Sequence, residues 1–353
     1  LNIPFVTLTG RDKGKARAEL LEQISNGAAR IVIGTHALFQ DTIEFHNLGF
    51  AVIDEQHRFG VHQRLKLSDK GKGVDILVMT ATPIPRTLTL TAYGDMDVSR
   101  LDEKPPGRKP VDTRLISKEQ LPRMVEGLGK EIAKGTQIYW VCPLVEESEV
   151  LDVAAAEERH AHLQQLFGDQ VGLVHGRMAA EEKDRMMRDF SSGALKILNA
   201  TTVIEVGVNV PNATIIVIEH AERFGLAQLH QLRGRVGRGG DQSYCFLIYD
   251  GPLSETAKER LDIMRRSEDG FLIAEKDLEL RGAGDLLGTQ QSGLPRFRLA
   301  PPEGASELLA MAADEAKLIL NNDADLEGGR GEALRTLLYL FERDRAIALL
   351  RSG

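Results

Sequence analysis

The sequence predicts an α/β protein built on parallel sheets, and three observations support this prediction. Uninterrupted apolar runs at 31–33, 50–53 and 76–79, the last within an expected strand at 75–79, have the length and composition of strands that are buried on both faces. Helical stretches alternate with such runs along the chain, which is typical of β-α-β units. Polar residues follow each run at once, and ligands of parallel sheets bind beyond the carboxyl ends of the strands.

The composition of the 353 residues excludes several other classes of protein. The hydrophobic content of 42% is ordinary for a globular chain, and no apolar run approaches the length of a membrane span. The two cysteines, Cys142 and Cys245, each lie inside an apolar run. This favours a reducing compartment over a disulfide framework or a zinc site. Because the net charge is −8, any binding to nucleic acid must use a local basic patch.

The first α/β unit is predicted at residues 1–108, and it ends within a stretch at 104–110 that contains three prolines and a glycine. Its expected elements are a helix at 12–25 that Asn26-Gly27 ends, and strands at 3–9, 31–36, 50–53 and 75–79. Residues 10–16 (Gly-Arg-Asp-Lys-Gly-Lys-Ala) do not qualify as a phosphate-binding loop. The glycine spacing is too short, and Ala16 has no hydroxyl for Mg²⁺.

A second α/β unit is predicted at 109–253, and a mostly helical region at 254–353. For the second unit we expect helices at 119–134, 154–167 and 180–191 and strands at 137–142, 171–174, 196–200, 214–219 and 243–249. For the last region we expect helices at 255–266, 306–320 and 332–350, with glycine-rich stretches at 281–284 and 288–293.

Asp54 and Glu55 are the first candidate functional residues, because they end the apolar run at 50–53. In nucleotide hydrolases an acid at this place holds the Mg²⁺ that bridges the β- and γ-phosphates, and a neighbouring carboxylate orients the attacking water. Solvation of a strand end is the alternative for two acids taken alone.

The most basic cluster lies at 228–239 and contains Arg233, Arg235 and Arg238. The planar guanidinium contacts phosphate oxygens in pairs, and an arginine finger contributes roughly 10³–10⁵ in rate. A solvated basic turn, or a general phosphate patch on nucleic acid, is the alternative. Glycines at 234, 237 and 239 favour a backbone held close to a ligand.

In combination these segments resemble the superfamily 2 helicases. Residues 54–57 (Asp-Glu-Gln-His), 80–82 (Thr-Ala-Thr) and 231–238 resemble motifs II, III and VI, and 200–211 resembles motif V. The sequences at 34–38, 58–64, 83–87 and 281–284 resemble those of the RecG family of branched-DNA translocases. The resemblance to this family extends over nearly the whole chain.

The resemblance implies a role for individual residues. Asp54 would hold Mg²⁺, Glu55 would polarise the attacking water, and Arg235 and Arg238 would be arginine fingers. The other implied residues fall into three groups: Thr82, Gly207, Asn209 and Gln231 at the nucleotide, Thr35, His36, Thr201 and Thr202 at the DNA backbone, and Arg260, Arg281 and Gln291 in the translocation motif. Asn209 stands where many relatives have Asp. For the translocation motif, a tight turn made by glycines 282, 284, 288 and 293 remains the alternative.

The resemblance also implies an activity and its partners. The expected parent is a monomeric, cytoplasmic bacterial protein of the nucleoid that uses ATP and Mg²⁺ to regress forks and migrate Holliday junctions. A single-strand-binding protein is an expected partner, and a membrane is not. The translocase module of the transcription–repair coupling factor shares the block at 80–87, but residues 54–64 and 92–95 favour the RecG family. A DNA-binding module that hydrolyses no ATP is the alternative of another class.

The chain departs from the family in two ways. It contains no phosphate-binding loop and no preceding wedge domain. We therefore expect a C-terminal piece of a longer protein that does not hydrolyse ATP alone. We also expect its first domain to expose a sheet edge or packing face.

Overall fold

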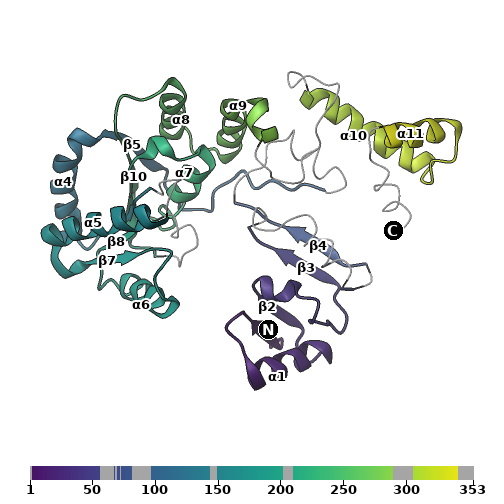
Figure 1. The fold of residues 1–353 in the computed structure, drawn as a ribbon, viewed down its shortest axis with the longest axis horizontal. Coiled ribbons are helices and arrows are strands. Elements are labelled where there is room, and N and C mark those ends of the chain that lie inside the picture. Colours follow the sequence, from purple (N-terminus) through teal and green to yellow (C-terminus); the bar gives the residue numbers. More distant parts are fainter. Residues whose placement is uncertain are drawn as a thin grey trace. The chain divides into compact units, whose positions relative to one another are not determined.

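The computed structural model describes residues 2–55, 67, 70–71, 73–81, 97–143, 149–201, 210–288 and 305–340 (Figure 1). The chain forms two compact units, Leu1–Ala81 and Thr82–Gly353, which we call unit 1 and unit 2 and describe separately. In these described ranges no helix is both long enough and apolar enough to cross a membrane.

Unit 1 contains the helix and the four strands that the sequence predicts. Strands β1 and β2 form one parallel pair, and β3 and β4 form a second parallel pair. The small core includes Val6, Leu8, Ile24 and Ile43 on the first pair. The bounds are β1 Phe5–Leu8, α1 Gly14–Ser25, β2 Ile31–Gly34, η1 His36–Phe39, β3 Phe50–Ile53 and β4 Asp75–Val78.

The strands of unit 1 are not buried on both faces, so that part of the prediction is wrong. In β3, Ala51 and Ile53 are buried, whereas the exposed fraction is 58% for Phe50 and 51% for Val52. Successive side chains of a strand point to opposite faces, and the described residues cover only one face. An uninterrupted apolar run has no alternation from which this difference can be read. The expectation of an exposed packing face is confirmed.

Unit 2 is built on a six-stranded parallel sheet with the strand order β5-β10-β9-β6-β8-β7. All five strands predicted for this region are present. The edge strand β5 was not predicted, because its sequence Val-Asp-Thr-Arg-Leu-Ile-Ser is mostly polar, unlike the buried strands. The bounds are β5 Val111–Ser117, β6 Gln137–Val141, β7 Val171–Val174, β8 Ile197–Ala200, β9 Ala213–Ile218 and β10 Ser243–Tyr249.

Helices cover both faces of this sheet. On β6, Ile138 and Trp140 pack in the core beneath α4 and α5, whereas Tyr139 and Val141 belong to the core on the opposite face, with α6 to α9. Each fully buried Leu or Ile contributes about 1.5–3 kcal/mol. The bounds are α4 Leu121–Ala133, α5 Glu149–Phe167, α6 Ala180–Ser191, α7 Leu226–Arg233, α8 Glu255–Arg266 and α9 Gly270–Gly288.

Helix α9 was not predicted, and it excludes the alternative of a tight turn at glycines 282 and 284, because residues 281–284 continue the helix. Glycine costs about 1 kcal/mol in a helix interior, so its presence favours a turn from sequence alone. Tertiary packing outweighs this preference, since Ile273 near the start of α9 is buried in the core. The Asp269 carboxylate accepts the Phe271 N–H at 2.9 Å and caps the helix. Beyond it lie α10 Ala305–Asn322 and α11 Gly329–Leu340, both predicted.

Candidate functional site

Asp54 and Glu55 lie at the carboxyl end of β3, as the sequence predicts. The Glu55 N–H donates to Asp54 Oδ1 at 2.8 Å, and Glu55 has a left-handed backbone with φ 54°. Non-glycine residues adopt this conformation rarely, and such strain is concentrated at functional sites. The Met79 N–H donates to the Ile53 carbonyl at 2.8 Å. Motif II and the start of motif III at Thr80 therefore leave the sheet side by side.

The exposed Asp54 carboxylate suits the role of a magnesium ligand. Protein sites for Mg²⁺ in nucleotide hydrolases use one or two carboxylates, and waters and substrate phosphates complete the octahedron. One carboxylate at a strand end is therefore a sufficient contribution from this strand. No group of three or more His, Cys, Asp or Glu side chains suited to a metal occurs among the residues that the structure describes.

The turn after β1 supports the rejection of a phosphate-binding loop at 10–16. The Asp12 carboxylate accepts the Thr9 N–H at 2.7 Å and the Thr9 hydroxyl at 2.9 Å. These hydrogen bonds, with the backbone one first, lower the pKa of Asp12. The turn thus places the Asp12 carboxylate at the start of this segment, and a negative charge there disfavours a bound phosphate.

Thr35 and His36 follow β2 and are exposed, as contacts to a DNA backbone require. Thr35 is the residue before η1, and its hydroxyl makes no capping bond there. The ring of His36 lies 6.3 Å from that of Phe39, measured between centroids. Both predicted DNA residues of unit 1 are therefore at its surface, at the carboxyl end of a strand.

In unit 2, Gln231, Arg235 and Arg238 are brought together by α7 and the turn that follows it. Arg235 is partly exposed and Arg238 is exposed, with its Nε donating to the Gly234 carbonyl at 3.0 Å. Gly237 has φ 75°, and a Cβ there would lie 2.8 Å from Cγ2 of Val111. The tight turn after α7 therefore requires glycine and directs two arginines from one short segment.

Arg233 differs from its two neighbours in the basic run, Arg235 and Arg238, and it is the one to which the resemblance assigns no role. Its exposed fraction is 3%. Nη1 donates to the carbonyls of Met264 at 2.7 Å and Ser267 at 2.9 Å, at the end of α8. Nη2 lies 3.2 Å from Nδ1 of His230. Arg233 therefore fastens α7 to α8 and does not face a ligand.

Arg260 of α8 also binds the protein's own backbone. Its two terminal nitrogens donate to the carbonyls of Phe224 at 3.0 Å and Glu222 at 3.1 Å, just before α7 begins. From α9, the Asp277 carboxylate accepts the Leu226 N–H at 3.3 Å at the first residue of α7. Together with Arg233, these bonds hold α7 at both ends. We call α8 and α9 with their connecting turn the helical hairpin.

The remaining predicted residues are placed as follows. Thr201 follows β8, and it is buried, with its N–H donating to the Val174 carbonyl at 3.2 Å. Arg281 lies in α9, and its side chain is outside the described residues. Also outside the described residues are Thr82, Thr202, Gly207, Asn209 and Gln291.

A buried polar cluster at the carboxyl end of β9 was not anticipated. The Glu219 carboxylate accepts bonds from Trp140 Nε1 and from Arg159 of α5, whose Nη2 is 2.9 Å away. Asn199 donates to the Ala156 carbonyl at 2.8 Å. These bonds fix α5 to the same sheet edge at which motif V begins. The signal in the sequence is weak, since the partners are far apart along the chain.

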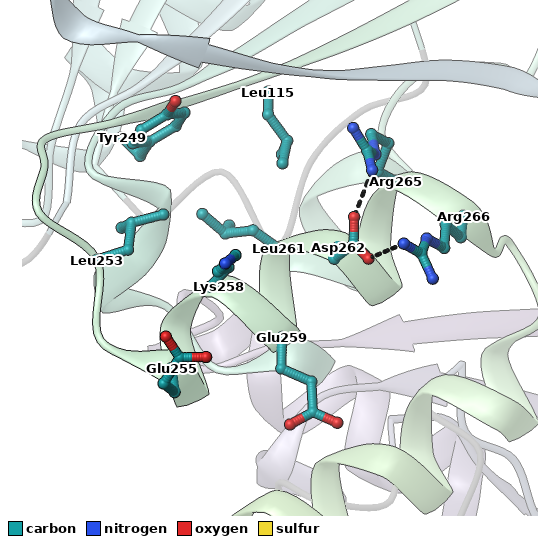
Figure 2. A pocket seen from close by; sticks show the side chains of 10 residues that line it. All are labelled: Leu115, Tyr249, Leu253, Glu255, Lys258, Glu259, Leu261, Asp262, Arg265 and Arg266. Carbon is teal, nitrogen blue, oxygen red and sulfur yellow. Dashed lines mark hydrogen bonds and ion pairs between the residues drawn. The ribbon is translucent and has the colours of Figure 1, made fainter.

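An open pocket of 660 Å³ lies between α8 and the ends of β5 and β10 (Figure 2). Its apolar part includes Leu115, Tyr249 and Leu261. In Figure 2, Asp262 lies between Arg265 and Arg266 and pairs with both, so the charges on this rim compensate one another. None of the predicted site residues lines this pocket.

Three family descriptions match the chain in order. They are "DEAD/DEAH box helicase" at 2–91, "Helicase conserved C-terminal domain" at 118–240, and "ATP-dependent DNA helicase RecG, domain 3, C-terminal" at 267–339. Each of the three ranges lies within one of the regions predicted from the sequence, 1–108, 109–253 and 254–353. The exact boundaries of these regions remain predictions.

Curated bacterial proteins named ATP-dependent DNA helicase RecG are similar over most of the chain. The protein of Synechocystis is 51% identical over 93% of this chain and 40% of its own length. That of Bacillus subtilis is 51% identical over 92% of this chain and 48% of its own length. That of Escherichia coli K12 is 52% identical over 85% of this chain and 44% of its own length. The chain thus spans less than half the length of these relatives.

Solved structures agree with these matches. RecG bound to a three-way DNA junction has a TM-score of 0.68 and 44% identity, covering 89% of this chain and 40% of that chain. Dbp5 of S. cerevisiae, bound to RNA and ADP BeF3, has a TM-score of 0.53, and the match covers 76% of this chain and 68% of that chain. Because the two are only 16% identical, this match shows the fold alone. By sequence and by its RecA-like fold, the chain belongs to the RecG family of superfamily 2 helicases.

Proposed function

We propose that the protein carrying this chain is an ATP-dependent translocase of double-stranded DNA that remodels branched DNA in recombination and repair. The observation that supports this most strongly is the match to RecG bound to a three-way DNA junction, at 44% identity over 89% of the chain. The match at 267–339 to a region described for RecG alone supports it over the helicase fold in general. The expected reactions are fork regression and branch migration of Holliday junctions.

In this proposal both units contribute to ATP hydrolysis. Asp54 binds Mg²⁺, and Glu55 orients the attacking water at the carboxyl end of β3. Arg235 and Arg238 stabilise the charge that develops on the γ-phosphate, and Gln231, Thr82, Gly207 and Asn209 contribute to nucleotide binding. Mg²⁺ supplies charge neutralisation at the phosphates when it is bound. The short turn after α7 supports the role of the arginines, since both lie on it and Arg238 is bonded to the Gly234 carbonyl.

DNA contacts are proposed on both units. Thr35 and His36 are exposed at a strand end, where hydroxyl, imidazole and amide groups suit phosphate oxygens. Thr202 is proposed for the second unit, and Arg281 and Gln291 for the translocation motif. The expected DNA contact of Thr201 does not fit this structure, because its exposed fraction is 2%. For Arg260 we propose a positioning role, because both terminal nitrogens bind backbone carbonyls before α7.

The activity belongs to the whole protein, since the chain spans 40–48% of the first relatives. We propose that this protein acts as a monomer in the bacterial cytoplasm at the nucleoid. A single-strand-binding protein is the proposed partner. The relatives from Synechocystis, Bacillus subtilis and Escherichia coli are all bacterial proteins with the same name.

The test measures conversion of a synthetic four-way junction to duplex products by the whole protein, with ATP and Mg²⁺. The wild-type protein should process the junction but leave a linear duplex of the same length intact, and Glu55→Gln should abolish the reaction. Arg185→Ala on α6 is a control, because Arg185 is exposed and lies outside the proposed site. Binding of the junction without any ATP-dependent conversion would instead support a module that hydrolyses no ATP.

A further inference from the structure

The turn at 267–269, which joins α8 to α9, is bonded to segments that are distant along the chain. Arg233 donates to the Ser267 carbonyl and so brings α7 to the turn. Asp269 begins α9 as its capping residue. Between these two residues, Glu268 binds a third segment. This turn therefore makes polar contacts with segments other than the two helices that it joins.

Glu268 binds the stretch that precedes β5. Its Oε2 pairs with Lys104 Nζ, and its Oε1 accepts the N–H of Val111, the first residue of β5. Nearby, the guanidinium of Arg100 lies 5.0 Å from the ring centroid of Phe271 on α9. We call residues 97–110 the connecting segment, because along the chain they lie between unit 1 and β5. Three contacts fasten the connecting segment and β5 to the helical hairpin.

Exposed ion pairs often contribute little to stability, and the pair between Lys104 and Glu268 alone would not hold the connecting segment in place. The exposed fraction is 49% for the Lys104 side chain and 23% for Glu268, so solvent screens this pair. The bond to Val111 is different, because its donor is a backbone N–H that begins an edge strand. Removing an acceptor from such a group leaves it without a partner from the chain. The stacking of Arg100 on Phe271 is a further contact at the same place.

We propose that Glu268 is a positioning residue that locks the connecting segment to the turn of the helical hairpin. The hairpin then holds α7, with its basic turn, through Arg233, and holds the connecting segment through Glu268. A movement of the hairpin therefore changes both the arginines at the γ-phosphate and the segment that leads to unit 1. The coupling part of this inference rests on the proposed function, whereas the lock itself does not.

Amide hydrogen exchange on this chain tests the lock without any activity. Glu268→Ala should raise exchange at Val111 and across the connecting segment at least tenfold. Glu268→Gln should restore protection of Val111, since its amide oxygen still accepts, but not of residues around Lys104. Lys104→Met should loosen the connecting segment alone.

Glu131→Gln on α4 is the matched control, because it removes the same charge from a pair with Lys134 that is 2.7 Å long. Unchanged exchange in Glu268→Ala would overturn the lock. So would a rise that spreads over the whole sheet with a lower urea midpoint, because Glu268 would then be a general stabilising residue.

The second measurement is the number of junctions converted per ATP hydrolysed by the whole protein. Glu268→Ala should lower this ratio at least threefold, leave the KM for ATP unchanged, and be partly rescued in Glu268→Gln. An unchanged ratio, with the exchange effect present, would overturn the coupling role. If the wild-type protein neither hydrolyses ATP nor converts junctions, the proposed function fails, and the exchange result still decides the lock.

Discussion

Two arginines of one basic run, Arg233 and Arg235, differ in environment although they are two positions apart. Arg233 is buried and binds two backbone carbonyls, and burial lowers its pKa. Arg235 is partly exposed on the turn that follows the helix. Side chains two positions apart point to nearly opposite sides of a helix, and Arg235 also lies beyond the last residue of α7. Arg233 therefore fixes the helix, whereas Arg235 lies on the turn beyond it.

Replacement of Arg235 by Ala should lower kcat for DNA-stimulated ATP hydrolysis by about 10³-fold, because the developing charge on the γ-phosphate loses its partner. The Kd for junction DNA should stay within about twofold. Steady-state kinetics and fluorescence anisotropy on the whole protein measure the two quantities. Arg185→Ala is the control, and normal hydrolysis in Arg235→Ala would remove this residue from the site.

His230 is held neutral beside Arg233. Burial, followed by the neighbouring Arg233 charge, lowers the pKa of His230 to about 4, although Glu268 and Asp269 act in the opposite direction. Lys104 also lowers it. Nδ1 of the neutral ring can accept from Arg233 Nη2, and a protonated ring cannot.

The free energy of unfolding should therefore fall as the pH falls from about 6.5 towards 4. In this window the unfolded chain binds a proton at His230 and the folded chain does not, so acid favours unfolding, by up to about 3 kcal/mol. Below 4 both states are protonated and the dependence on this residue ends. Urea unfolding from pH 4 to 7.5 should show a smaller slope in His230→Gln, and an identical slope would contradict the assignment.

Among the secondary-structure elements, the sequence predicted those with a clear apolar pattern. The strands from β6 to β10 and helices such as α4 and α6 appear at the predicted places. Strand β5 was missed because an edge strand is mostly polar. Helix α9 was missed because Gly282 and Gly284 favour a turn locally, whereas packing of its first half determines the helix.

The same distinction applies to the candidate site. The acids after β3 and the arginines after α7 could be identified because each follows an element within a few positions. The bonds of Arg233, Arg260 and Glu268 join elements that are about 30 to 160 positions apart along the chain. No local pattern encodes such contacts, so only the fold reveals that these charged residues bind the chain itself.

Replacement of Arg233 by Met should destabilise unit 2 by about 1–3 kcal/mol, because the Met264 and Ser267 carbonyls lose their donor. The loss should appear in urea unfolding and in faster amide exchange of α7. Arg185→Met, at an exposed position of α6, should change stability by less than about 0.5 kcal/mol. Equal stabilities of the two variants would show that Arg233 does not fasten the helices.

At the scale of the whole molecule, the two units carry different parts of one proposed reaction. Unit 1 presents Asp54 and Glu55, and unit 2 presents the basic turn and the helical hairpin that holds it. Hydrolysis in this account depends on residues of both units, so each single substitution should stop it without unfolding the other unit. In the proposed reaction, the hairpin and its contacts with the connecting segment couple ATP hydrolysis to movement of the DNA.

The most direct test measures ATP hydrolysis by the whole protein at saturating junction DNA and Mg²⁺. Glu55→Gln, Arg235→Ala and the double variant should each lower kcat by about 10³-fold or more. The double variant should be little worse than the worse single variant, because residues that act on one transition state are not additive. Full hydrolysis in either single variant would contradict the proposed role of that residue in ATP hydrolysis.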